Sequence, residues 1–521
     1  MRLHRREVLQ VAGAAGALLV GLPRPAQARA GALEIHLATR NTVLGAIGVR
    51  GRALVTRKPQ PFKAYRSFPR VTLGHEPPWE GSPLARTVRS PASTPGFGEA
   101  GLTIEELARL LHLTNGVTGT GGAVAARHPL RAAPSAGALY PGEVYVVAER
   151  VEGLEPGLYY YSVVHHQLVL LGAGSHAGEL VSSVEDPNAI AGAAAIVLIS
   201  NVFARSRVRY ANRGYRYALV DTGHIGENLR LAASAQGLRE TASLRFHDDR
   251  LNALLHIDGA DEAVCAVHAV GPAGASAHSL PAVALLERDN APRDADPVAR
   301  YHAASGLVPD SEGLPTPAST AARPWALEAP AAVIDLPLSD AEGDLTVDQA
   351  IRTRRSSRRI ETTPIERSEL SFVLEMAEGH AAHSRAPGVA LFAVANRVAG
   401  LEPGLYRYDR TGPALALHRP GTLARSLKDA CLGQQKAARA AVVLLMVGAL
   451  EAAAASSGQR SYRDLLIEAG AIAQRAYLAA EAIGLTARNL ASFVDDRLNA
   501  LCGFDGRRQA VLHLTVVGRG D

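Results

Sequence analysis

The sequence predicts an α+β protein in which one folding unit occurs twice. The segment GLEPGLY at residues 153–159 returns at 400–406, and DDRLNAL at 248–254 returns at 495–501. Both pairs have the same offset, since 400 − 153 = 247 and 495 − 248 = 247. Two matches at one offset indicate a dimer fused into one chain, an intramolecular pseudo-dimer that no longer has to be symmetric.

The elements of the first copy follow from hydrophobic periodicity and capping signals. A helix is expected to begin after Thr103, which serves as the N-cap, with Glu106 closing a capping box. A long helix is expected over 214–236. Strands are expected over residues 143–148, 158–161, 167–171, 194–200 and 263–270, the second and third forming a hairpin and the fourth lying centrally.

The second copy repeats this order. Its strands are expected over 389–395, 405–408, 415–418, 441–447 and 509–517, and its long helix over 462–483. Both long helices carry small residues at helical spacing, which lets two helices approach closely. We expect them to meet at the pseudo-twofold axis through Ala218, Thr222 and Gly226 on one helix and Ala469, Ala473 and Ala476 on the other. The alternative is that these residues only reflect an alanine-rich composition.

Charge and cysteine usage exclude several classes of function. The net charge of +5 is mild, and we find no basic tail or aromatic-interleaved basic patch, so no nucleic-acid partner is expected. The three cysteines form no CxxC pair, and the histidines show no metal-binding spacing. We therefore expect no disulfide framework and no metal site.

The first 30 residues resemble a targeting segment. Arg5-Arg6 precedes an apolar stretch over 8–22, and Ala26-Gln27-Ala28 has the pattern of a cleavage site. The paired arginines favour a twin-arginine signal and export to the periplasm or the cell exterior. An ordinary secretory signal or an uncleaved anchor is the alternative. After residue 31 no apolar stretch is long enough to span a membrane, so no span is expected in the mature chain.

These features divide the chain into four parts. They are a signal segment over 1–30, a first repeat over 31–272, a linker with the N-terminal extension of the second repeat over 273–345, and the second repeat over 346–521. The linker is rich in proline and alanine, but it also carries Tyr301 and His302, so part of it is expected to be ordered.

Two motifs could bind a ligand. Residues 353–359, TRRSSRR, follow a short predicted helix, and arginine and serine side chains together can hold a phosphate. Residues 131–141, RAAPSAGALYP, precede a strand and carry little side-chain bulk, so their backbone could lie against a flat ring. Taken alone, each has an ordinary alternative, a solvated arginine run in the first case and a tight turn in the second.

Together these motifs resemble the nitroreductase superfamily, and most closely its SagB/ThcOx-type dehydrogenases. Four segments carry the resemblance: PSAGALYP at 134–141, GYRYALVDTGHIGENL at 214–229, RRSSRRI at 354–360 and GLTARNLASFVDDRLNALCGFDG at 484–506. The resemblance implies two fused nitroreductase-like repeats, with antiparallel-rich central sheets wrapped by helices. It also implies FMN bound where the repeats meet, with NAD(P)H as a possible electron donor.

The resemblance assigns roles to individual residues. Phosphate and ribityl contacts would come from Arg354, Ser356 and Arg358, with Arg355 nearby. The flavin ring would be lined by Pro134, Ser135, Ala136 and Gly137. Gln434 would face the pyrimidine edge of the ring, and the backbone of Ala491 and Ser492 would approach its N5 atom.

Each repeat lacks one of the two motifs. Glu106 pairs with Glu369 at an offset of 369 − 106 = 263, which exceeds the later offset of 247 by 16 residues, and the second repeat has no PSAG segment there. The first repeat has only YRSFPR at 65–70 where the arginine motif is expected. The sequence therefore predicts one composite FMN site, with phosphate contacts from repeat two and ring contacts from repeat one.

The catalytic candidates are Tyr210 and Arg209. In azoline dehydrogenases of the SagB type a Lys-Tyr pair accepts the proton, and the matching pair here is Arg209-Tyr210. Arginine is a poor base, so Tyr210 is the better proton relay, and an ion pair with a surface acid is the other interpretation of Arg209. Asp221 and His224 share a helix face, and we expect a buried, satisfied pair there.

The sequence thus indicates an FMN-dependent oxidoreductase acting on a small molecule or peptide whose identity the sequence does not give. One alternative is an azoline dehydrogenase that oxidises a thiazoline or oxazoline in a modified peptide. Another is a degenerate flavin-binding protein without turnover. The sequence leaves association between two chains open.

Overall fold

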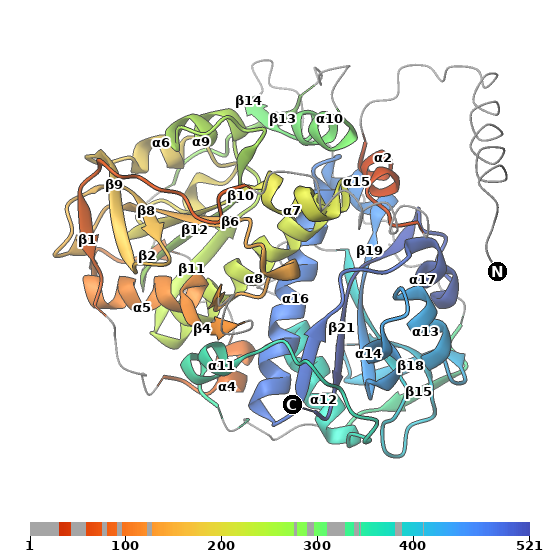
Figure 1. Cartoon of the computed structure of the whole chain (residues 1–521). Helices are drawn as coiled ribbons and strands as arrows, with labels where there is room; N and C mark the ends of the chain where they lie inside the picture. The colour runs from red at the N-terminus through yellow and green to blue at the C-terminus, as the bar shows by residue number, and fades with distance from the viewer. Residues whose placement is uncertain are drawn as a thin grey trace, which may run out of the picture.

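A computed structural model describes most of the chain after the predicted signal segment. It covers residues 31–42, 59–74, 81–90, 96–121, 128–275, 279–288, 296–309, 329–337, 343, 345–380, 388–409 and 411–520. Residues 1–30, which carry the twin-arginine expectation, lie outside it. Figure 1 shows two lobes side by side, with two long helices between them. In the described part of the chain, no helix is long and apolar enough to cross a membrane.

The first lobe is built on an antiparallel sheet. Its main strand order is β1-β9-β8-β6-β10-β12-β11, with the short strand β2 paired to β12. The bounds are β1 Arg70–Thr72, β2 Gly96–Phe97, β6 Gly142–Ala148, β8 Gly157–Ser162, β9 Gln167–Ala173, β10 Ala195–Val202, β11 Leu238–Ser243 and β12 Glu262–Gly274. Every residue of β6 is buried and only the last of β10 is not, as expected for apolar strands covered on both faces.

The second lobe repeats this topology. Its strand order is β15-β18-β17-β16-β19-β21-β20, which matches the first sheet position by position. The bounds are β15 Ala332–Asp335, β16 Val389–Ala395, β17 Gly404–Asp409, β18 Ala414–Pro420, β19 Val442–Ala449, β20 Thr486–Asn489 and β21 Gln509–Gly518. The expected duplicated α+β fold with antiparallel sheets is therefore confirmed.

Helices cover the sheets and form the contact between the lobes. In the first repeat they are α4 Leu84–Arg89, α5 Ile104–Asn115, α6 Ala177–Val181, α7 Phe203–Tyr210, α8 Arg213–Ala235 and α9 Asp248–Leu254. In the second they are α11 Val347–Thr353, α12 Arg367–Glu378, α13 Ala424–Ala430, α14 Gln435–Arg439, α15 Leu450–Ser457, α16 Ser461–Ala482 and α17 Asp495–Cys502. The predicted capping box at Thr103 is present, since its side chain accepts from the Glu106 N–H at 3.1 Å.

The long helices α8 and α16 pack against each other at the centre of the molecule (Figure 1). They approach tightly at Gly223 and Gly470, where a Cβ on either would overlap the backbone of the other helix. The expected contact through Gly226 is wrong, because that glycine faces His268 of the neighbouring strand β12. Thr222 likewise faces its own sheet, where its hydroxyl accepts from Asn201 at 2.7 Å.

Part of the linker is ordered, as expected. It holds α10 Pro297–Ala304, which is the counterpart of α2 Ala32–Ala38 in the first repeat. His302 of α10 contacts the Tyr215 hydroxyl at 3.0 Å, and His36 of α2 contacts the Tyr462 hydroxyl at 3.2 Å. Because 462 − 215 = 247, each repeat sends its N-terminal helix across to the other repeat. Two short strands, β13 Leu285–Glu287 and β14 Leu307–Pro309, flank α10.

The repeated DDRLNAL segment joins the two repeats. Asp495 is 2.7 Å from both Arg213 and Arg216 of the other repeat, and the three side chains are almost fully buried. At the equivalent positions, Asp248 binds Arg460 at 2.7 Å and Arg463 at 3.1 Å. Burial alone would raise the pKa of Asp495, but the two guanidiniums outweigh it and lower that pKa to about 2.

The asymmetry has a structural basis. Between α5 and β6 the first repeat carries the hairpin of β4 Val117–Gly121 and β5 His128–Arg131, followed by the Pro-Ser loop, residues 134–140. The second repeat passes from α12 to β16 with 16 fewer residues, since 26 lie between Asn115 and Gly142 but only 10 between Glu378 and Val389. The predicted deletion thus removes the hairpin and the loop together.

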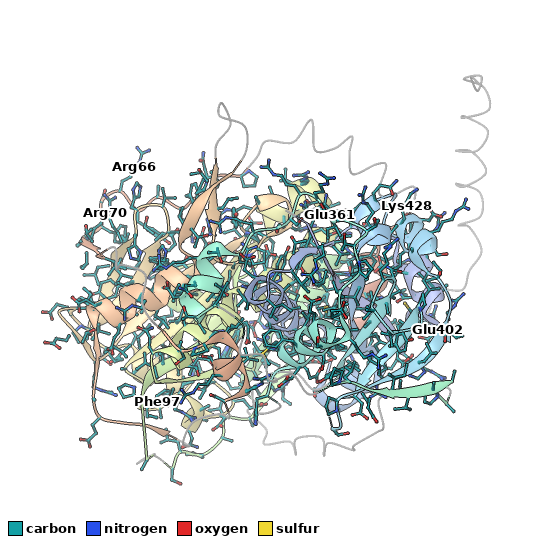
Figure 2. All side chains as sticks on the ribbon, turned by 90° about the horizontal axis from the view of Figure 1, so that it is seen from below. Arg66, Arg70, Phe97, Glu361, Glu402 and Lys428 are labelled. Carbon is teal, nitrogen blue, oxygen red and sulfur yellow. The ribbon has the colours of Figure 1, made fainter. Side chains whose placement is uncertain are left out.

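The expected counterpart of the arginine motif is wrong. Residues 65–70 lead into β1, which matches β15, so they do not correspond to 354–358. Helix α4 instead matches α11, and Pro83 forms a bridge with Thr346 at the offset of 263. That offset pairs Arg354–Arg358 with residues 91–95, PASTP, which contain no cation and lie outside the described residues. Figure 2 shows Arg66 and Arg70 at the outer edge of the first repeat, far from Glu361.

Candidate functional site

The two motifs meet at the contact between the repeats. Arg354, the C-cap of α11, is only 4% exposed. Its Nε donates to the carbonyl of Ala132 at 3.2 Å and its Nη2 to that of Arg131 at 3.4 Å. Its Nη1 is buried and has no hydrogen-bond partner among the described residues. The arginine motif of the second repeat therefore lies against the residues that lead from β5 into the Pro-Ser loop of the first.

The rest of the arginine motif is held from several sides. The Arg355 guanidinium donates to the Thr118 carbonyl of β4 at 2.6 Å, and the exposed Ser356 hydroxyl contacts the Tyr477 hydroxyl of α16 at 2.9 Å. The Arg354 guanidinium also lies over the Tyr477 ring, 5.3 Å from its centroid. Arg358 is exposed at the edge of this group. The motif therefore presents cations and a hydroxyl on a firmly held backbone.

The Pro-Ser loop has a constrained backbone. Gly137, Ala138 and Tyr140 all have positive φ, at 66°, 54° and 47°. Non-glycine residues rarely adopt this conformation, and such residues concentrate at functional sites. The Ser135 hydroxyl accepts from the Tyr140 N–H at 3.0 Å and so closes the loop, while Pro134 is buried beneath it.

The catalytic candidates lie beside this loop. A Cβ on Gly137 would be 2.6 Å from the Tyr210 hydroxyl and 2.9 Å from the Arg209 Nη1, so both groups approach the glycine closely. Burial raises the pKa of Tyr210 to about 12, although the nearby charge of Arg209 opposes the shift. Arg209 is exposed, stacks on the Tyr210 ring and has no carboxylate partner within the described ranges. The alternative in which Arg209 pairs with a surface acid has no support there.

The residues of the second repeat that were predicted to approach the edge of the flavin ring lie near Tyr210 as well. Tyr217 of α8 packs edge-on against Tyr210, with ring centroids 4.8 Å apart, and donates to the carbonyl of Ala491 at 2.8 Å. Gln434 donates through Nε2 to the carbonyl of Ser492 at 2.8 Å. The structure therefore brings Gln434, Ala491 and Ser492 to the candidate region through Tyr217 and Tyr210.

Asp221 and His224 are buried beneath the loop but are not a satisfied pair. Their nearest polar atoms are 3.9 Å apart, and Asp221 Oδ2 and His224 Nδ1 have no hydrogen-bond partner in the described structure. Burial raises the pKa of Asp221 to about 8, and hydrogen bonds from the Ser135 hydroxyl and the Ala136 N–H oppose the shift. Burial lowers the pKa of His224 well below its usual value. Both side chains are thus neutral near pH 7.

The equivalent position on the other side of the pseudo-twofold is built differently. Tyr477 is replaced there by Arg230, since 477 − 247 = 230. Arg230 donates to fully buried Glu227 at 2.6 Å, and Arg475 approaches the same carboxylate at 3.2 Å. These arginines have a carboxylate partner, whereas Arg354 has none in the described parts of the chain.

Several further residues of the site had no role assigned from the sequence, although Arg488 and Asn489 lie in the segment 484–506 that carries the resemblance. Asn489 of β20 contacts the His224 Nε2 at 2.9 Å, and its N–H donates to Tyr477 at 2.8 Å. Arg488 donates to the carbonyl of Ser357 at 2.8 Å. The available signal was the repeat itself, because positions in which the two copies differ in charge gather here. No group of three potential metal ligands occurs among the residues described.

Comparisons with known proteins agree with this architecture. The model of the Nitroreductase family matches residues 96–271 and again 351–519. A protein named as a candidate nitroreductase from Methanocaldococcus jannaschii is 32% identical over 172 residues, which span 33% of this chain and 80% of that protein. The trifolitoxin-processing protein TfxB of Rhizobium leguminosarum bv. trifolii is 32% identical over 136 residues, 25% of this chain and 36% of that one. The crystal structure of a candidate nitroreductase from Anabaena variabilis superposes with a TM-score of 0.74 at 25% identity and covers 94% of this chain and 99% of that one.

Proposed function

The chain belongs to the nitroreductase family, and from that premise we propose that it is an FMN-dependent oxidoreductase with one composite site between its repeats. The observation that carries the proposal is the contact of Arg354 with the carbonyls of Arg131 and Ala132. It joins the two motifs across the pseudo-twofold and leaves a buried guanidinium nitrogen of Arg354 without a partner among the described residues.

The residues present fit this cofactor. A doubly charged phosphate needs cations and hydroxyls, and Arg354, Ser356 and Arg358 would supply them, with Arg355 behind. The backbone of residues 134–137 would line the ring, and Gln434, Ala491 and Ser492 would approach its polar edge. FMN, when bound, supplies the transfer of electrons and hydride, and this chain supplies binding, orientation and proton positions.

Tyr210 is the group we propose for proton transfer to the substrate. Its pKa of about 12 keeps the hydroxyl protonated near neutral pH, so it can donate but is a weak acceptor. Arginine is a poor base, so the role of Arg209 is to orient the substrate rather than to accept a proton. The Tyr217 hydroxyl holds the Ala491 carbonyl and fixes the wall opposite the Pro-Ser loop.

A peptide substrate is the second candidate. The relative TfxB is named for processing trifolitoxin, which favours the azoline dehydrogenase alternative. The Arg209-Tyr210 pair stands against it, since that type uses a Lys-Tyr pair as proton acceptor. The third possibility, a degenerate flavin-binding protein, predicts bound flavin that no donor reduces.

We propose export by the twin-arginine route for the N-terminal segment. That route carries folded proteins, which suits a site assembled from both repeats around a cofactor. Cleavage after Ala28 would leave α2, which begins at Ala32, in place between the repeats. N-terminal sequencing of protein recovered outside the cytoplasm tests this proposal.

The absorbance spectrum of the purified protein tests the function. The proposal expects a flavin spectrum that bleaches when NADH or NADPH is added without oxygen and returns when an oxidant is added. A flavin spectrum that neither donor bleaches favours the degenerate alternative. A colourless protein that takes up no FMN contradicts the proposal.

A further inference from the structure

The composite site is surrounded by more positively charged side chains than are needed to bind the phosphate of a cofactor. Six cations lie around it, and none has a carboxylate partner within the ranges that the structure describes. They are Arg209, Arg354, Arg355, Arg358, Lys436 and Arg488. Elsewhere between the repeats Arg213 and Arg216, which are also buried, do have such a partner in Asp495.

The pseudo-symmetric positions make the difference clear. Arg209, Lys436 and Arg488 correspond through the offset of 247 to neutral residues, which are Ser456, Ala189 and Thr241. Arg354, Arg355 and Arg358 correspond through the offset of 263 to Pro91, Ala92 and Pro95. Arg245 on the opposite side does have a carboxylate, Glu185 at 2.7 Å. Among the described residues, positive charge without a carboxylate partner therefore accumulates on the side that kept both motifs.

Three of the six cations are not among the residues proposed to contact the phosphate. The Arg209 guanidinium lies beside Gly137 and Tyr210, on the first repeat. Arg488 and Lys436 come from the second repeat, where Arg488 donates to the Ser357 carbonyl. The positive charges of Arg209 and Arg488 both oppose the raised pKa of Tyr210. Lys436 lies two residues after Gln434, which donates to the carbonyl of Ser492, and the Ser492 side chain contacts Tyr217 beside Tyr210. The three cations therefore come from segments that meet around Tyr210, and burial together with the charge of Arg488 lowers the pKa of Lys436.

Acidic groups do little to balance these charges. Asp221 faces Tyr210 from α8, but its pKa of about 8 leaves it mostly protonated near neutral pH. Glu481 acts on Arg354, at the phosphate end of the site. A region of three cations beside a neutral carboxyl favours an anion over a neutral group.

We propose that the substrate carries an anionic group, a carboxylate or a phosphate, which binds beside Tyr210 between Arg209 of the first repeat and Arg488 and Lys436 of the second. The inference rests on the proposed function and names the substrate class of that site. Arg209 is its specificity-determining residue, because it is exposed beside the Pro-Ser loop and its counterpart is Ser456.

The test compares two probes of the same shape, benzoate and benzamide, by isothermal titration of the flavin-loaded protein. Benzoate should bind roughly tenfold more tightly or better, because hydrogen bonds to charged groups are the stronger ones. Arg209→Gln should remove most of this preference while flavin content and circular dichroism stay unchanged. The matched control is Arg66→Gln, another exposed arginine, which lies at the outer edge of the first repeat and should keep the preference.

Four outcomes overturn the inference. Equal binding of the two probes by a protein that carries flavin rejects the anionic substrate and leaves the proposed function standing. An equal loss of both probes in Arg209→Gln shows that the side chain acts on shape rather than charge. Arg209→Gln could instead weaken the binding of NADPH relative to NADH and leave the binding of benzoate unchanged. In that case the anionic group that Arg209 binds is the phosphate of the electron donor, not a group of the substrate. A protein that takes up no FMN overturns the proposed function and this inference together.

Discussion

Gly223 and Gly470 lie against each other where the two long helices cross. A Cβ on Gly223 would be 2.0 Å from the carbonyl oxygen of Ile467, and a Cβ on Gly470 would be 2.1 Å from that of Val220. Since 470 − 223 = 247 and 467 − 220 = 247, the same contact is made twice across the pseudo-twofold axis. The candidate site lies between the two repeats, so its geometry depends on how closely these helices approach.

Gly223→Ala should therefore destabilise the protein. The added methyl has no room without separating α8 from α16, and overpacking of this kind costs about 1–3 kcal/mol or more. Gly178→Ala is the control, because α6 has open space at that position and alanine is the better helix former. Chemical denaturation of both variants measures the difference, and equal stabilities would show that the helices do not pack at Gly223.

The two buried aspartates should have matching effects. Asp495→Asn and Asp248→Asn each remove a carboxylate shared by two arginines, which costs roughly 3–5 kcal/mol for a buried pair. The folded-state pKa of Asp495 is lowered to about 2, so its stabilising effect is complete above the unfolded-state pKa near 4. The effect is lost as the pH falls through 2. Unfolding measured at pH 7 and pH 3 checks both points, and a large effect of only one variant would contradict the equivalence.

Asp221→Asn should change how stability depends on pH. Burial raises the folded-state pKa of Asp221 to about 8, so the folded protein holds a proton that the unfolded chain releases near pH 4. Stability is therefore lost as the pH rises from 4 to 8, by roughly 1.4 kcal/mol for each unit of raised pKa. Asparagine carries no such proton. The variant should match the parent at pH 3, below both pKa values, and exceed it at pH 9, whereas parallel profiles would show that Asp221 is already ionised in the folded protein.

The proposed phosphate contacts can be tested by measuring whether variants that lack them still retain the cofactor. Arg354→Ala together with Arg358→Ala should release FMN, since each hydrogen bond to a charged group contributes roughly 1.5–3 kcal/mol. Arg66→Ala together with Arg70→Ala is the matched control, because that pair is exposed at a sheet edge. Flavin retained after gel filtration is the measurement. If the 66/70 variant released flavin and the 354/358 variant retained it, the phosphate contacts would have to be assigned to the first repeat instead of the second.

Much of the fold could be predicted because it depends on local patterns. Apolar runs such as the one in β10 determine a central strand, and the offset of 247 determines the order of the second sheet without further information. The capping box at Thr103 is likewise a property of neighbouring residues. These elements form as predicted because tertiary contacts reinforce the local preferences of the sequence rather than override them.

The failures concern relations across the repeats. Gly226 and Gly223 are equally small, and only packing decides that Gly223 meets α16 while Gly226 meets His268. The counterpart of the arginine motif was misplaced because the sequence similarity between the two copies does not extend as far towards the N-terminus as α4. In that part of the chain the copies are aligned by the structure, through the bridge between Pro83 and Thr346. The pairing of Arg354 with the Pro-Ser loop, by contrast, was already indicated by what each repeat lacks.

The number of flavins per chain tests the central claim most directly. Flavin released by denaturation is measured by its absorbance and divided by the concentration of the 521-residue chain. In the sequence, the arginine motif and the Pro-Ser loop come together on one side of the pseudo-twofold, and an unpartnered phosphate on the other side would be costly to remove from water. The account predicts one FMN per chain. Two per chain would show that the opposite half-site still binds and would contradict the composite single site.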